Sequence, residues 1–146
     1  MIVLDTNVIS ELMRAAPNRK VVSWVDSRPT GALAVSAVTV AEVLYGISQQ
    51  DDGQRKETLH TLAHAMFEEE FRKRVLSFGA EEAKMYADLV TQRQAQGLPI
   101  SMADAQIAAI ALRWGGQLAT RNTADFAGLG LDVINPWDAE ATQKDR

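Results

Sequence analysis

The chain has 146 residues, a length that fits one domain with a sizeable hydrophobic core. It contains no cysteine, which excludes disulfides, thiolate metal sites and a cysteine nucleophile. Its formal net charge of −4 argues against a protein that holds nucleic acid by a basic surface. An acidic, cation-filled site that handles phosphates remains compatible with this charge.

Short apolar runs alternate with helical patterns along the chain, which is typical of βαβ units. We expect strands over residues 2–4, 32–35, 75–78, 117–120 and 131–134. We expect helices over residues 8–13, 18–27, 55–71 and 102–114, and two more that begin after Ser36 or Thr39 and after Gly79.

Three of these helices carry an apolar stripe that we expect to face the core. In the helix that begins after Ser36 or Thr39, the stripe is Val40, Val43, Leu44 and Ile47. In the helix over residues 55–71 it is Leu59, Leu62, Ala63 and Met66, and in the helix after Gly79 it is Ala83, Tyr86, Ala87 and Val90.

Asp5 directly follows the first apolar run, residues 2–4. An apolar run without alternation is typical of a strand buried on both faces, and open α/β sheets bind ligands at the carboxyl ends of their strands. The alternative is that Asp5 merely ends the strand and begins a turn. Thr6 or Asn7 can cap the helix that follows.

Asp104 and Glu42 are two further acids on predicted helices. The helix of Asp104 is largely apolar, so its carboxylate must be paired, capped or bound to a metal ion. Ser101 and Asp104 also match a capping-box variant, so a cap and a functional site both remain open. Glu42 lies opposite the apolar stripe of its helix, and periodicity therefore predicts an ordinary solvated acid.

Asn122 and Asp125 follow the fourth apolar run and would lie at the same sheet edge as Asp5. Both side chains can supply oxygen, although such residues are also expected in a turn or a helix cap. Acids that converge at one edge repel one another, and Mg²⁺ or Mn²⁺ relieves that repulsion. Such an ion can also activate a water for attack on a phosphodiester.

Four segments together closely resemble the PIN-domain ribonucleases, and more narrowly the VapC toxins, including their FitB-like branch. The segments are residues 3–7, 36–42, 102–109 and 119–122, and the ending Asn135-Pro136-Trp137 is also similar to the FitB-like branch. The resemblance implies a three-layer α/β/α PIN-like domain with a small, mostly parallel sheet flanked by helices. This single domain would cover residues 1–137, with a polar tail over residues 138–146.

The same resemblance implies a metal-dependent endoribonuclease that cleaves tRNA or rRNA as the toxin of a toxin–antitoxin pair. Asp5, Glu42, Asp104 and Asn122 would be the catalytic residues. Asp5 and Asp104 would bind Mg²⁺ or Mn²⁺, together with Glu42, Asn122 or Asp125. The role of Glu42 rests on the family alone, because periodicity predicts a solvated acid.

The fourth ligand position departs from the family pattern. The family often has an acid where this chain has Asn122, which offers a carbonyl oxygen but no charge. Asp125 is the alternative ligand, one helical turn away. The resemblance further implies that Thr6, Asn7 and Thr120 orient the carboxylates or a metal-bound water.

The resemblance also implies protein partners. A VapB- or FitA-like antitoxin would block the acidic groove. Apolar residues of the helices over 55–71 and 81–96 could form a homodimer, within a larger toxin–antitoxin assembly. We expect a cytoplasmic protein without a signal peptide or membrane segment.

Two other functions are compatible with the sequence. One is a weakly active or inactive PIN-fold module that binds RNA or an antitoxin-like protein. The other is a phosphatase or phosphotransfer domain, which is disfavoured because no second aspartate lies two residues beyond Asp5. Arg14, Arg19, Lys20 and Arg121 are expected to be ordinary surface cations, with contact to an RNA backbone as the alternative.

Overall fold

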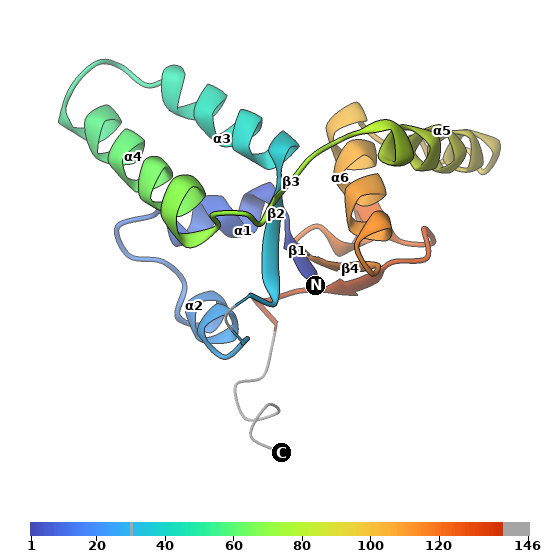
Figure 1. Ribbon diagram of the computed structural model, residues 1–146, viewed down its shortest axis with the longest axis horizontal. Helices are drawn as coiled ribbons and strands as arrows, with labels where there is room; N and C mark the ends of the chain where they lie inside the picture. The colour runs from blue at the N-terminus through green and yellow to red at the C-terminus, as the bar shows by residue number, and fades with distance from the viewer. Residues whose placement is uncertain (30, 139–146) are drawn as a thin grey trace.

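The computed structural model describes residues 1–29 and 31–138, and its strands form one parallel sheet in the order β3-β2-β1-β4-β5 (Figure 1). The strands are β1 (Ile2–Leu4), β2 (Leu33–Ser36), β3 (Val75–Leu76), β4 (Gln117–Ala119) and β5 (Asp132–Ile134). Every pairing is parallel in the described sheet, which we expected to be mostly parallel. β1 lies at the centre, where Val3 pairs with Ala34 of β2 and Leu118 of β4.

Helices follow each of the first four strands. They are α1 (Thr6–Leu12), α2 (Arg19–Asp26), α3 (Ala37–Ser48), α4 (Gln54–His64), the π-helix η1 (Ala65–Glu70), α5 (Ala80–Ala95), α6 (Met102–Arg113) and the 3-10 helix η2 (Thr123–Phe126). The helix predicted over residues 55–71 is therefore confirmed as a helical segment, but its last turns are a π-helix. There the Phe71 N–H bonds to the Met66 carbonyl at 2.9 Å, and Met66, Phe67 and Phe71 are buried.

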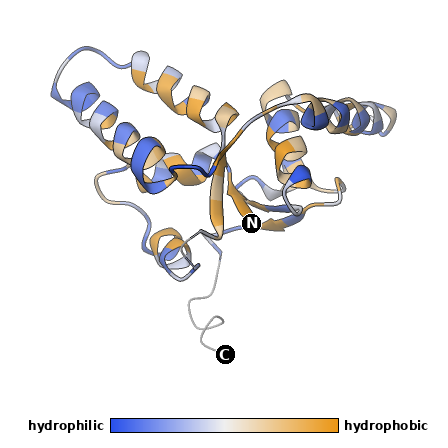
Figure 2. Cartoon of the chain, in the orientation of Figure 1, coloured by the Kyte–Doolittle hydropathy of each residue, from blue (hydrophilic) through white to orange (hydrophobic). Residues whose placement is uncertain are grey.

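The helices cover both faces of the sheet, which confirms the three-layer α/β/α architecture (Figure 1). Successive side chains of a strand point to opposite faces. Accordingly, Ile2 and Leu4 pack with α1 to α4, whereas Val3 packs with α5 and α6. Figure 2 shows hydrophobic residues concentrated in the strands, with hydrophilic residues along the outer helix α4.

Two leucines of the predicted stripes are exposed, so that part of the prediction is wrong. Leu44 of α3 is 43% exposed and Leu62 of α4 is 41% exposed, whereas Val43, Ile47 and Ala63 are buried as expected. Periodicity identifies the apolar side of a helix but not how much of it a neighbouring element covers.

The predicted stripe of α5 is also displaced. Ala83 and Ala87 are exposed, and the buried residues are Glu82, Leu89 and Arg93. Both charged residues are buried because their side chains satisfy backbone groups. The Glu82 carboxylate accepts the Gly79 N–H at 3.0 Å, while Arg93 donates to carbonyls of a distant turn. Polar requirements of the backbone therefore outweigh hydrophobic patterning here.

The described helices include none that is long and apolar enough to cross a membrane. Of the tail predicted over residues 138–146, Asp138 is exposed, and the remaining residues lie outside the described part of the chain.

A matched pair of leucine substitutions tests which helix faces form the core. Leu89→Ala should lower the free energy of unfolding by about 2–5 kcal/mol, because Leu89 is 4% exposed and its removal leaves a cavity. Leu44→Ala should change it by less than about 0.5 kcal/mol, because Leu44 is already open to solvent. Urea unfolding of both variants measures the difference, and equal losses would contradict this core.

Candidate active site

Asp5 lies at the carboxyl end of the central strand and is only 4% exposed. Its Oδ1 accepts the Thr6 N–H at 2.8 Å, which caps α1. Its Oδ2 accepts a hydrogen bond from the Thr120 hydroxyl at 2.8 Å and a longer one from the Asn7 amide at 3.5 Å. Asp5 therefore ends the strand, as one interpretation predicts, and its carboxylate also lines a cleft, as the other requires.

Burial raises the pKa of Asp5 from its ordinary value of 3.8 to about 6. The hydrogen bonds from Thr120 and Thr6 oppose this rise, and the nearby charges of Asp104 and Glu42 add to it. The carboxylate is thus held in a fixed orientation but in surroundings that favour its protonated form. A nearby cation would favour the charged form instead.

Thr6, whose N–H bonds to Asp5, also links Glu42 to this part of the site. The Thr6 hydroxyl donates to Glu42 Oε1 at 2.5 Å, and its oxygen lies 3.0 Å from the Thr39 hydroxyl. Because a hydroxyl has one proton, Thr39 is the donor to Thr6, and Ser36 in turn donates to Thr39 at 3.4 Å. Glu42 is exposed, as periodicity predicts, but its carboxylate is held in place by this chain of hydroxyls.

Asp104 lies in the first turn of α6, where its backbone N–H takes part in the helix cap and its carboxylate lines the cleft. The Ser101 hydroxyl accepts the Asp104 N–H at 3.2 Å, which is one half of the predicted capping box. The reciprocal bond, from the Ser101 N–H to the Asp104 carboxylate, is absent from the described hydrogen bonds. Partial burial raises the pKa of Asp104, Asp125 and Glu42 add to the rise, and the Ser101 side chain opposes it.

One cleft of about 550 Å³ brings together all four predicted catalytic residues. Its lining consists of Asp5, Glu42, Asp104 and Asn122, together with Thr6, Asn7, Ser10, Glu11, Arg14, Arg121 and Trp137. Thr120 lies behind Asp5 and is fully buried; its oxygen accepts the Asn122 N–H at 3.1 Å and the Asn7 amide at 3.2 Å.

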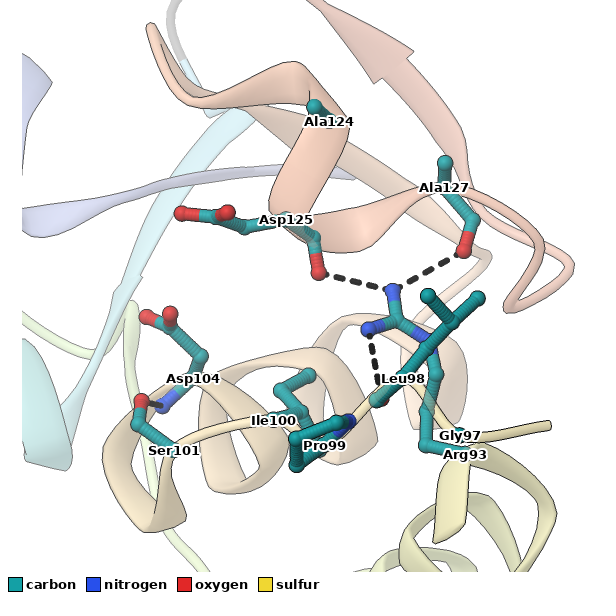
Figure 3. A pocket seen from close by; sticks show the side chains of 10 residues that line it. All are labelled: Arg93, Gly97, Leu98, Pro99, Ile100, Ser101, Asp104, Ala124, Asp125 and Ala127. Atoms are coloured by element: carbon teal, nitrogen blue, oxygen red, sulfur yellow. Dashed lines mark hydrogen bonds between the residues drawn. The ribbon is translucent and has the colours of Figure 1, made fainter. Parts of the chain in front are cut away.

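Asp125 lines a neighbouring cleft of about 460 Å³, which shares Asp104 with the first (Figure 3). Figure 3 also shows Arg93 reaching the backbone of the turn that carries Asp125. Its guanidinium donates to the carbonyls of Asp125 at 2.7 Å and Ala127 at 2.9 Å, and to Leu98 at 3.4 Å. The sequence does not predict this role of Arg93, because an arginine near the end of a helix ordinarily indicates a solvated side chain.

The donor set of the first cleft fits a hard divalent cation. It offers carboxylate, amide and hydroxyl oxygens, and none of Asp5, Glu42 and Asp104 takes part in an ion pair among the described residues. Within residues 1–29 and 31–138, no three acidic or histidine side chains converge closely enough to enclose an ion. Mg²⁺ commonly binds through one or two carboxylates and keeps several waters, so this spacing suits a hydrated ion.

The family model described as PIN domain matches residues 2–130. Plasmid stability protein StbB of Pseudomonas syringae is 45% identical, over 95% of this chain and 100% of its own. VapC ribonuclease Y4jK of Sinorhizobium fredii is 42% identical, over 94% of this chain and 99% of its own. Toxin FitB of Neisseria gonorrhoeae is 39% identical, over 94% of this chain and 99% of its own.

Two solved structures have the same fold as this chain. The crystal structure of FitAcB from Neisseria gonorrhoeae matches with a TM-score of 0.89 and 38% identity, over 95% of this chain and 100% of the other. The structure of FitAB bound to an IR36 DNA fragment also gives a TM-score of 0.89, over 96% of this chain and 98% of the other.

The raised pKa of Asp5 predicts how stability depends on pH in the metal-free protein. The unfolded chain loses this proton near pH 3.8 and the folded protein near pH 6, so the folded state binds more protons between these values. The free energy of unfolding should therefore fall as the pH rises from about 4 to about 6, by at most about 3 kcal/mol from this group.

The measurement is urea unfolding from pH 3.5 to 7.5 with chelator present. Asp5→Asn keeps an oxygen for the Thr6 N–H and cannot ionise. The free energy of unfolding of Asp5→Asn, relative to that of the parent, should increase as the pH rises from 3.5 to 7.5. A difference that does not vary with pH would contradict the raised pKa of Asp5.

Proposed function

The chain belongs to the PIN-domain family, and from that premise we propose that it is a divalent-metal-dependent endoribonuclease and the toxin of a toxin–antitoxin pair. The observation that carries the proposal is the shared cleft of Asp5, Glu42 and Asp104. The names of two close relatives, a VapC ribonuclease and a toxin, support the activity.

Asp5 and Asp104 would hold Mg²⁺ or Mn²⁺, with Glu42 and Asn122 as further oxygen ligands. A bound divalent cation lowers the pKa of water and offsets the charge of a phosphodiester in the transition state. Of the two candidates for the fourth position, we favour Asn122, because it lines the cleft of Asp5 whereas Asp125 lines the neighbouring one.

The protein side chains supply orientation and proton transfer. Thr6 and Thr120 fix the carboxylates of Glu42 and Asp5 by hydrogen bonds, and Asn7 supports Thr120. Asp104 is more exposed than Asp5, which is fully occupied by hydrogen bonds from Thr6, Thr120 and Asn7, so the Asp104 carboxylate is the more accessible to a water in the cleft. We therefore assign the Asp104 carboxylate as the group that accepts the proton of the attacking water.

The substrate would be a structured RNA such as tRNA or rRNA, which places the reaction in the cytoplasm. The partner would be a VapB- or FitA-like antitoxin whose arginine enters the acidic cleft and pairs with a carboxylate. The complexes FitAcB and FitAB support such a partner. A homodimer through α4 and α5 remains a further proposal, for which Leu62 offers an exposed apolar side chain.

A second candidate function is a weakly active or inactive module that binds RNA or the antitoxin. The observation in its favour is Asn122, because an amide at this position leaves the cleft with one negative charge fewer than an acid would. Cleavage and metal binding by the purified protein distinguish the two functions.

The first test is cleavage of a panel of bulk tRNA, rRNA and RNA hairpins by the antitoxin-free protein, with Mg²⁺, with Mn²⁺ and with chelator. Asp104→Asn should lower kcat at least about 100-fold, because the acceptor of the proton is lost. The fold should persist, since the backbone N–H of residue 104 still bonds to Ser101.

Asp88→Asn is the matched control, because Asp88 is an exposed acid of α5 outside the cleft. It should cleave like the parent. Full activity of Asp104→Asn, or metal-independent cleavage by the parent, would contradict the proposed mechanism.

A second test concerns the fourth ligand position. Asn122→Asp should tighten Mn²⁺ binding about tenfold, because it adds a negative charge to an acidic oxygen site. Asn122→Ala should weaken binding, whereas Asp125→Asn should alter it less than about twofold. Titration calorimetry with Mn²⁺ measures all three, and a larger effect at Asp125 would reverse the assignment.

A further inference from the structure

An acidic cleft repels the phosphates of RNA, so a nuclease of this kind needs positive charge at its rim. Most protein contacts to nucleic acid go to phosphate and sugar, and arginine is the most suitable donor because its guanidinium can pair with two oxygens. The cations that line this cleft are Arg14 and Arg121.

Arg14 is already paired with a buried acid. Its guanidinium lies 3.1 Å and 3.3 Å from the two carboxylate oxygens of Glu11, which is 7% exposed. The same carboxylate accepts the Asn18 N–H at 2.8 Å, so Glu11 has a structural role between α1 and α2. The charge of Arg14 is therefore largely compensated.

Arg121 is held in place without being neutralised. Its backbone N–H donates to Asn7 Oδ1 at 3.2 Å, and its guanidinium carbon lies 4.9 Å from the centre of the Trp137 ring. In the described part of the chain, its guanidinium takes part in no ion pair or hydrogen bond, and the residue is exposed.

Trp137 is itself fixed at the rim. Its backbone N–H donates to Asn135 Oδ1 at 2.9 Å, and its partly buried ring packs against the core cluster of β1 and α1. An aromatic ring under a guanidinium restricts its orientation and leaves the edge that carries the N–H donors free. Arg121 is thus an oriented cation beside the carboxylates.

We propose that Arg121, oriented by Trp137, binds a phosphate of the RNA strand next to the phosphodiester that is cleaved. This inference rests on the proposed nuclease function. Arg121 makes the contact, and Trp137 is a positioning residue. Such a contact brings the strand to the carboxylates without placing a cation among them.

The experiment measures binding of a labelled RNA hairpin and of bulk tRNA by catalytically inactive Asp104→Asn protein, over a range of salt concentrations. Adding Arg121→Gln should raise Kd about tenfold, the loss expected for one hydrogen-bonded charge. It should also reduce the salt slope by about 0.7 for a single-stranded contact. In the active protein, the same change should raise KM with little effect on kcat.

Arg113→Gln is the control for charge, because it removes the same charge from a second arginine–tryptophan pair; unlike Arg121, Arg113 also lies 3.9 Å from the carboxylate of Glu82, so the stability of this variant is measured as well. Arg113 lies 5.1 Å from the centre of the Trp114 ring, about 14 Å along α6 from Asp104 at about 1.5 Å per residue. It should bind RNA like the parent. Arg121→Lys should keep the salt slope but lose affinity, and Trp137→Phe should lose less affinity than Trp137→Leu.

Three results would overturn the assignment of Arg121. The first is an unchanged Kd for Arg121→Gln when the parent binds RNA. The second is weaker Mn²⁺ binding by Arg121→Gln, which would indicate an effect through the carboxylates. The third is a loss of antitoxin binding alone, which would assign Arg121 to a protein partner. A parent that neither binds nor cleaves any RNA of the panel would instead overturn the proposed function itself.

Discussion

The carboxylate of Asp5, buried at the end of the central strand, is the group on which the site depends. It accepts hydrogen bonds from the start of α1 and from Thr120, which follows β4. Thr6 continues this network to Glu42 on α3, and Asn7 continues it to the backbone of Arg121. The geometry of the whole cleft is therefore built outward from one side chain in the middle of the sheet.

The hydrogen bonds to Asp5 fix the local backbone and side chains, but they hold its carboxylate where the charged form is disfavoured. Burial and neighbouring acids raise the pKa of Asp5, while hydrogen bonds only partly offset the cost of its charge. Burial and neighbouring acids also raise the pKa of Asp104, and the Ser101 side chain opposes the rise. In active sites such unfavourable charge is commonly retained because it prepares the site for a ligand. A divalent cation or an arginine of a protein partner would relieve the same repulsion, so in the proposed function one cleft would serve both catalysis and inhibition.

Much of the fold could be predicted because a parallel sheet buries its strands on both faces. Each apolar run became a strand, and Asp5 and Asn122 could be assigned to one sheet edge. Features that depend on distant partners could not be predicted. Periodicity describes Glu42 only relative to its own helix, whereas its partner Thr6 is far away in sequence. Arg93 is buried because it binds carbonyls of a turn some thirty residues later, and a helical pattern contains no sign of them.

The order of the strands along the chain also has a consequence for the synthesis of the protein on the ribosome. Asp5 and its partner Thr120 are separated by 115 positions, and Asp104 lies on the last long helix. During translation, the first hundred residues contain Asp5 and Glu42 but neither Asp104 nor β4, so a nascent chain has an incomplete cleft. Because domains fold as units once their segments have emerged, the carboxylates meet only near the end of synthesis. A growing chain therefore lacks the complete acidic cleft, and with it the activity proposed for the protein, until its last segments have emerged.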